Sequence, residues 1–187
     1  MLTRNVKRSF EALETKRLMT CDVSFDGTDL NINCDEAGDF ILIRQESGDL
    51  IVGLDNLGSA ANLEDVKIKS GGGDDAIIID GLDIAGDLKI KSGDGDDVVT
   101  LIGLAIGDDA KIRTQGGDDN VFFQGATTVG DDLNVRTGSG NDQVFALFGA
   151  AIAGDDIRLN GGSGDEDSLV GEANFTAGDD LKIKGFE

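Results

Sequence analysis

The stretch LKIKSGDGDDVVTLIGLAIGDD, residues 88–109, contains one complete copy of a repeating unit. Residues 88–92 alternate apolar and basic side chains, which is the pattern of a half-buried strand. A glycine–aspartate turn follows at residues 93–97, and a second, apolar strand at residues 98–102. A bend at Gly103 leads to a short third segment, and the unit closes on a Gly-Asp-Asp turn. Three short faces per unit predict a triangular coil.

The first strand of this unit recurs through the chain, with copies that begin at Val66, Leu88, Ala110, Leu133, Ile157 and Leu181. These starting residues are 22, 22, 23, 24 and 24 positions apart. An earlier copy at Leu30 aligns with the copy at Val66, and 14 additional residues separate the two. A period of this length is typical of a solenoid. The sequence therefore predicts an all-β fold, a right-handed parallel β-helix (β-solenoid) of about six coils of 22–24 residues over residues 21–187.

Stacked strands lie about 4.7–4.9 Å apart, so equivalent residues of successive coils form continuous columns. The apolar positions of the first strand then form two inward columns. The alternate positions point outward and form a basic strip, which comprises Lys67, Lys69, Lys89, Lys91, Lys111, Arg113, Arg136, Arg158, Lys182 and Lys184. A solvated face that resists edge pairing is one interpretation of this strip. Binding of an anionic polymer, such as an anionic polysaccharide, is the other.

The second strand of the unit predicts an apolar stripe. If Ile77, Val99, Val121 and Val144 face inward, the outward positions are occupied by Ile78, Val98, Ile102, Phe122 and Phe145. A contiguous apolar patch of this kind usually marks an interface. The alternative is that the irregular segment 44–64 covers the stripe. Self-association is expected either through this stripe or through the exposed edge of the final strand, residues 181–185.

Composition excludes several classes of function. The 187 residues include no histidine, tryptophan or tyrosine, and the net charge is −21. Without histidine there is no Ser/His or Cys/His nucleophile pair and no HExxH zinc site. The negative charge disfavours a nucleic-acid partner. Every candidate catalytic residue recurs in each coil, whereas an active site needs a unique cluster, so we expect no enzymatic activity.

Acidic residues recur at both turns of the unit. At the first turn, one column contains Asp74, Asp96, Asp118, Asn141 and Asp165, and the adjacent column contains Asp75, Asp97, Asp119, Asp142 and Glu166. At the Gly-Asp-Asp turn, a further column contains Asp87, Asp109, Asp132, Asp156 and Asp180. Two unit charges about 5 Å apart repel by roughly 3 kcal/mol at an effective dielectric constant near 20. Basic side chains or a divalent cation must therefore offset these columns.

The segment Gly93-x-Gly95-x-Asp97-x-Val99 resembles the GGxGxDxUx nonapeptide of RTX proteins, glycine- and aspartate-rich repeat proteins that bind Ca²⁺ between successive turns. The copies at residues 71–77 and 138–144 match the same core. This resemblance implies Ca²⁺ at the GxGxD turns, with ligands from Asp74, Asp75, Asp96, Asp97, Asp118, Asp119, Asn141, Asp142 and Asp165. RTX rolls carry the motif twice in each 18-residue turn, whereas here it occurs once per coil. The alternative is a tight turn whose aspartates cap backbone amides, and this structural role is expected at the Gly-Asp-Asp turn.

The segment from Phe10 to Met19, FEALETKRLM, resembles the FExLExRxLL segment near the start of large repetitive surface proteins of planctomycetes. That resemblance implies an extracellular or envelope location. Val6, Phe10 and Leu13 also have helical spacing, so residues 1–20 are expected to form a short helix for targeting or for capping the first coil. The segment lacks the apolar stretch of a Sec-type signal, which favours non-classical or type I-like export. No apolar run has the length of a transmembrane segment.

The two cysteines, Cys21 and Cys34, match no metal or redox spacing. They are expected to form a disulfide outside the cell, or to remain as small buried hydrophobic residues in a cytosol. Together these features predict an extracellular or cell-surface protein, structural or adhesive, whose solenoid is stabilised by Ca²⁺. The alternative is a polysaccharide-binding or polysaccharide-cleaving β-helix protein.

Overall fold

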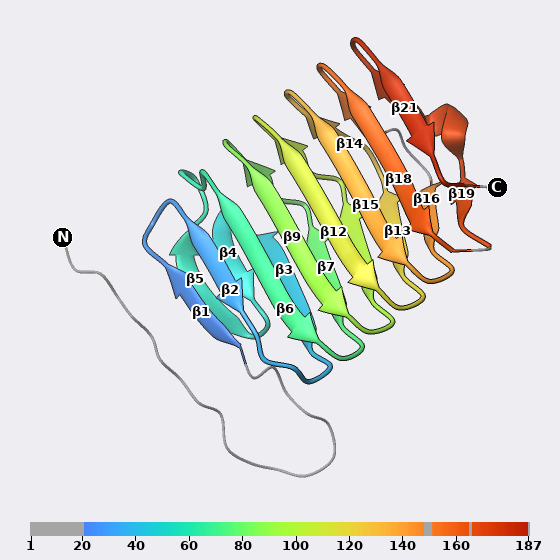
Figure 1. Cartoon of the computed structure of the whole chain (residues 1–187). Coiled ribbons are helices and arrows are strands. Elements are labelled where there is room, and N and C mark those ends of the chain that lie inside the picture. The colour runs from blue at the N-terminus through green and yellow to red at the C-terminus, as the bar shows by residue number, and fades with distance from the viewer. Residues whose placement is uncertain (1–20, 148–150, 165, 187) are drawn as a thin grey trace.

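The computed structural model describes residues 21–147, 151–164 and 166–186, and it confirms the predicted β-solenoid (Figure 1). Three sheets run along the solenoid. Sheet A contains, in spatial order, β1 (Asp22–Phe25), β2 (Leu30–Asn33), β6 (Val66–Gly72), β9 (Leu88–Asp94), β12 (Ala110–Gly116), β15 (Leu133–Ser139), β18 (Ile157–Ser163) and β21 (Leu181–Lys184). The strands from β2 to β21 are parallel, as expected for stacked coils.

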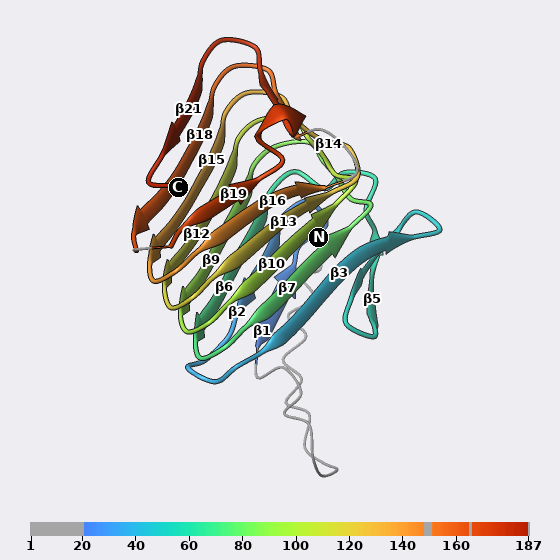
Figure 2. The same ribbon diagram turned by 90° about the vertical axis from the view of Figure 1, so that its right-hand side faces the viewer.

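The two other sheets form the remaining faces (Figure 2). Sheet B contains β19 (Ser168–Val170), β16 (Gln143–Leu147), β13 (Asn120–Gln124), β10 (Val98–Ile102), β7 (Ala76–Asp80), β3 (Phe40–Glu46), β4 (Asp49–Val52) and β5 (Asp55–Ser59). Sheet C contains β20 (Phe175–Ala177), β17 (Ala151–Ala153), β14 (Thr127–Val129), β11 (Ala105–Ile106) and β8 (Asp83–Ile84). A 3₁₀ helix, η1 (Glu172–Asn174), precedes β20. Full coils begin at β6, β9, β12, β15 and β18, so the described chain makes about five turns, with partial coils before and after them.

The register of sheet A follows the sequence repeat. Leu88 pairs with Ala110, Ala110 with Leu133, and Leu133 with Ile157. These four side chains are completely buried. The equivalent side chain of Leu181, on the last strand of the sheet, is 40% exposed because only one strand flanks it. The predicted inward columns are thus confirmed, and they fill the interior of the solenoid with aliphatic side chains.

The inner side of sheet B completes this core. Ile77, Val99, Val121 and Val144 occupy one column and have no exposed surface. Outside the same strands, Phe122 and Phe145 stack with ring centroids 4.7 Å apart. The predicted outward apolar stripe is therefore present, and its members Ile78, Val98, Ile102, Phe122 and Phe145 are half-buried.

The 14-residue insertion forms an antiparallel hairpin, β4 and β5, which extends sheet B beyond β3. The sequence alternative in which segment 44–64 covers the apolar stripe is wrong, because the hairpin pairs with the free edge of β3 rather than lying over β10 and β13. Leu50 and Val52 instead join the core. β1 likewise pairs antiparallel with β2. Both sheets thus end on antiparallel strands beside the first coil.

The helix expected within residues 1–20, and the proposed role of that segment, lie outside the described residues. Within the part of the chain that the structure describes, no helix combines the length and the apolarity needed to cross a membrane.

Candidate functional site

The first turns of successive coils are joined by a reciprocal pair of hydrogen bonds, each from a backbone amide to an aspartate carboxylate. Between the coils that begin at β6 and β9, the amide of Asp75 donates to Oδ1 of Asp97 at 2.9 Å, and the amide of Asp96 donates to Oδ1 of Asp74 at 3.0 Å. The arrangement repeats one coil later, where the amide of Asp97 donates to Asp119. Successive residues of an extended chain point to opposite sides, so the two aspartates of each turn face in opposite directions.

The inward-facing aspartates form a buried column that contains Asp39, Asp75, Asp97, Asp119, Asp142 and Asp167, each no more than 5% exposed. In each consecutive pair, the amide of the earlier residue donates to Oδ1 of the later one, over 2.7–2.9 Å. Sequence alignment assigned Glu166 to this column, which is wrong. The additional residue in the last GxGxD turn shifts the chain by one position, and Asp167 rather than Glu166 accepts the amide of Asp142.

The second carboxylate oxygens of this column face a buried column of hydroxyls. Oδ2 of Asp75, Asp97, Asp119 and Asp142 is buried and accepts no well-aligned hydrogen bond from the described residues. Beside these four carboxylates lie the hydroxyls of Ser70, Ser92, Thr114 and Thr137, respectively, which are completely buried. Three of the hydroxyls also lie within hydrogen-bond distance of a carbonyl of the next coil, as Thr114 does to Thr137 at 2.9 Å.

This environment favours the neutral carboxyl. Desolvation raises the pKa of Asp97 to about 7, against the smaller opposing effect of the Ser92 hydroxyl. The same cause raises the pKa of Asp119 to about 6, with a further contribution from the charge of Asp142. A protonated Oδ2 can donate to the adjacent hydroxyl oxygen, which keeps its own hydrogen for the carbonyl of the next coil. For Ser70, Thr114 and Thr137 protonation therefore satisfies the carboxyl and the hydroxyl together, whereas Ser92 has no such carbonyl among the described residues.

The outward-facing aspartates form the exposed column, which we define as Asp74, Asp96 and Asp118 with Asn141. Oδ1 of each aspartate accepts the amide of the next member, over 2.8–3.0 Å. Their side chains remain open to solvent. Asn141 follows Asp118 in the column. Its backbone N–H donates the hydrogen bond to Asp118, so this contact does not require a charged side chain at position 141.

The structure thus separates the predicted Ca²⁺ ligands into two sets that differ in burial and point to opposite sides of the turn. Asp75, Asp97, Asp119 and Asp142 lie inside the solenoid, whereas Asp74, Asp96, Asp118 and Asn141 lie on its surface; Asp165 is outside the described residues. Ca²⁺ takes six to eight oxygen ligands from carboxylates, carbonyls and water. Among the described residues, no three carboxylates of the turns bring ligand atoms within 4.8 Å of one another. The buried set does not fit a hydrated cation, while the exposed set can offer one or two carboxylates to one.

The Gly-Asp-Asp turn serves a structural role, as predicted. Asp65, Asp87, Asp109, Asp132 and Asp156 each accept the amide of the equivalent aspartate in the next coil, over 2.9–3.2 Å. The other oxygens of Asp87, Asp109, Asp132 and Asp156 pair with the basic strip, as in Lys89–Asp87 and Lys111–Asp109, both at 2.6 Å. The hydrogen bond from Lys89 lowers the pKa of Asp87. Backbone amides and lysines together offset the charge of this column.

The basic strip divides into two columns. The inner basic column, next to the Gly-Asp-Asp turn, contains Lys67, Lys89, Lys111, Arg158 and Lys182. All of these except Lys67 pair with a carboxylate of that turn. The outer basic column contains Lys69, Lys91, Arg113, Arg136 and Lys184, all exposed. Within the described chain, none of its five members forms an ion pair.

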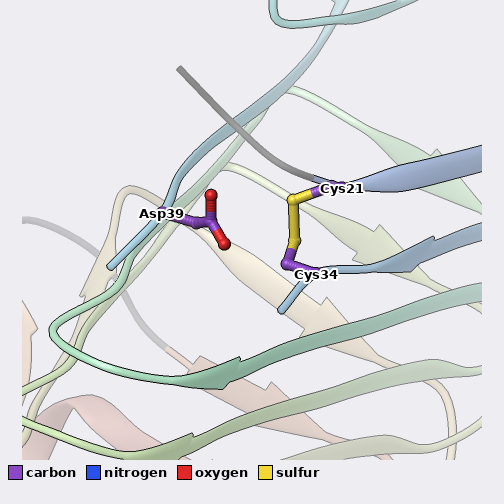
Figure 3. A group of neighbouring side chains, drawn as sticks. All are labelled: Cys21, Cys34 and Asp39. Carbon is purple, nitrogen blue, oxygen red and sulfur yellow. A yellow bond between two sulfur atoms is a disulfide. The ribbon is translucent and has the colours of Figure 1, made fainter. Parts of the chain in front are cut away.

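Asp39 lies beside a disulfide between Cys21 and Cys34, which joins the chain before β1 to the end of β2 (Figure 3). The three side chains are the one group of possible metal ligands that the described residues bring together. Because both sulfurs are bonded to each other, they are not available as thiolate ligands. Asp39 and the buried hydroxyls were not among the predicted site residues, although the alignment of residues 30–43 on 66–79 places Asp39 opposite Asp75.

Comparisons of the chain with protein-family models, with curated proteins and with solved structures found no match.

Proposed function

We propose that the protein is a non-catalytic structural or adhesive solenoid of an extracellular or cell-surface assembly. The observation that carries this proposal is the repetition of every polar column from coil to coil. The aspartates of both turns accept hydrogen bonds from the backbone of the adjacent coil. The repeated carboxylates therefore hold the coils together. A catalytic centre would instead need one coil that differs from its neighbours.

The extracellular location is supported by the Cys21–Cys34 disulfide, because disulfides persist in oxidising compartments. The bond closes a loop around β1 and β2, where the solenoid begins. It therefore reinforces the end of the stack, at which a coil has a neighbour on one side only.

The exposed column is the proposed Ca²⁺-binding site. Asp74, Asp96 and Asp118 have carboxylates that repeat at the coil spacing and remain open to solvent. In the structure their Oδ1 atoms accept amides, which leaves Oδ2 for a cation. We expect these residues to hold Ca²⁺ with turn carbonyls and water completing its shell, and the ion to reduce the repulsion between coils.

Thermal unfolding with and without Ca²⁺ tests the proposal. A ligand that binds only the folded state raises its stability by mass action, so millimolar Ca²⁺ should raise the Tm relative to EDTA. The triple variant Asp74→Asn, Asp96→Asn, Asp118→Asn should lose this increase. The matched variant Asp108→Asn, Asp131→Asn, Asp155→Asn removes the same charge at the other turn and should retain it. Equal Tm values for the wild type in Ca²⁺ and in EDTA would reject calcium stabilisation.

A further inference from the structure

The outer basic column is a row of cations that form no ion pairs with the described residues, although the protein as a whole is acidic. Lys69, Lys91, Arg113 and Arg136 occupy four consecutive coils and pair in register across β6, β9, β12 and β15. They are exposed, and within the described chain they contact no carboxylate at ion-pair distance. In the neighbouring inner basic column, by contrast, four of the five cations pair with an aspartate. The outer column lacks such partners, although like charges so close together repel.

The same face has a shallow hollow. A depression of about 210 Å³ lies between the two basic columns and is lined chiefly by Lys67, Lys69, Lys89, Lys91, Lys111 and Arg113. It follows the solenoid axis over three coils. The aliphatic stems of these side chains line its walls, and their charged ends point to solvent, as is usual for long basic residues. A narrow chain fits this shape better than a broad protein surface does.

We propose that the outer basic column binds a linear anionic polysaccharide that lies along the solenoid axis. The coils repeat every 4.8 Å or so, a distance comparable with the length of one sugar ring in an extended chain. A polymer with one carboxylate or sulfate per sugar can therefore place one anion against each coil. Arg113 and Arg136 can grip such groups with two parallel hydrogen bonds, while Lys69 and Lys91 provide point charges. The inference rests on the proposed surface location, where such polymers occur.

Two other partners fit less well. Each strand of a duplex presents a phosphate every 3.4 Å or so of helix axis, which does not match the coil repeat. The strip also carries no aromatic side chain on which the bases of a single strand would stack. A second copy of the chain would bring a net charge of −21 toward another −21. Each is an outcome that the experiment below can detect.

Binding to polygalacturonate, which carries one carboxylate per sugar, tests the proposal with the purified full-length protein. Calorimetry at low ionic strength in EDTA should show binding, and salt should weaken it. Uncharged dextran should not bind. Dextran sulfate added in parallel shows whether sulfate esters are preferred to carboxylates, and binding of either polymer supports the proposal. Working in EDTA separates this result from Ca²⁺ stabilisation, which is measured by unfolding without polymer.

The variant Lys69→Gln, Lys91→Gln, Arg113→Gln should lose about tenfold or more in affinity, because it removes three of the proposed contacts. The matched variant Arg44→Gln, Arg158→Gln, Lys182→Gln changes the net charge equally but removes cations that pair with carboxylates outside the hollow, so it should lose clearly less. Unchanged far-ultraviolet circular dichroism and Tm confirm that both fold. The proposal is overturned by absent binding, by equal losses in both variants, by equal affinity for duplex DNA, or by self-association that the first variant abolishes.

Discussion

The amide of Asp97 donates a 2.9 Å hydrogen bond to Oδ1 of Asp119, the equivalent residue one coil later. Both side chains are completely buried. The carboxylate of each later aspartate in the buried column thus accepts a backbone amide of the previous coil. These bonds join the coils along the inside of the turn. This arrangement places a row of carboxyl groups out of contact with solvent. The free energy of unfolding therefore depends on their protonation.

The first prediction concerns pH. The folded pKa values of Asp97, about 7, and Asp119, about 6, lie above the ordinary value of 3.8. The folded state therefore holds protons that the unfolded state releases. The stability from these groups is complete below about pH 4 and is lost as the pH rises through about 7. Urea unfolding in EDTA should show a falling free energy of unfolding from about pH 5 to about pH 8. If the free energy of unfolding rose over this range, the buried column would not be the main source of the pH dependence.

The second prediction separates the two aspartates of one turn. Asp97→Asn keeps an acceptor for the amide of Asp75 without a charge, so it should flatten the pH dependence of unfolding and leave stability at about pH 8 no lower than in the wild type. Asp97→Ala leaves that amide unpaired and should lose about 1–3 kcal/mol at about pH 5. Asp96→Asn is the control, because Asp96 is exposed; it should change the pH profile far less, and only through the loss of its charge near Asp119. An identical profile for Asp97→Asn would exclude Asp97 from the titration.

The third prediction concerns close packing of the coils. Gly93 has φ of 124°, and a Cβ there would overlap the carbonyl oxygen of Gly71 in the previous coil. Gly93→Ala should therefore lower the free energy of unfolding by about 3 kcal/mol or more. Gly103 also has positive φ, 56°, but a Cβ there meets nothing within 4 Å. Gly103→Ala should lose only about 1–2 kcal/mol, from backbone conformation alone. Chemical denaturation of both variants measures the difference, and similar losses would refute the role of coil contact.

The fourth prediction concerns the disulfide. The Cys21–Cys34 bond spans 13 residues and restrains the unfolded chain. Replacing both cysteines by serine should lower the free energy of unfolding by about 2–4 kcal/mol. A reducing agent should lower the Tm of the wild type but leave that of the double variant unchanged. If reduction had no effect on the wild type, the bond would contribute nothing to stability.

Much of the fold could be predicted because the repeat constrains it. Val66, Leu88 and Ala110 begin equivalent strands, and stacking places them in one column in only one register. The separation of Asp96 from Asp97 could not be predicted, since the preceding glycines adopt positive φ and interrupt the alternation that identifies inward positions within strands. The shift from Glu166 to Asp167 has the same origin, because an additional residue in a turn moves the register without changing the strands.

The coil, its three faces and most of the side-chain columns follow from the sequence alone, because they depend on period and alternation, which are local and repeated. The fold in three dimensions was needed to learn which aspartate of each turn is buried, which cations pair with carboxylates, and where the hairpin after β3 lies. These features depend on contacts between coils about 22 residues apart. In such contacts the direction of a side chain is selected by the adjacent coil rather than by its own neighbours in the chain.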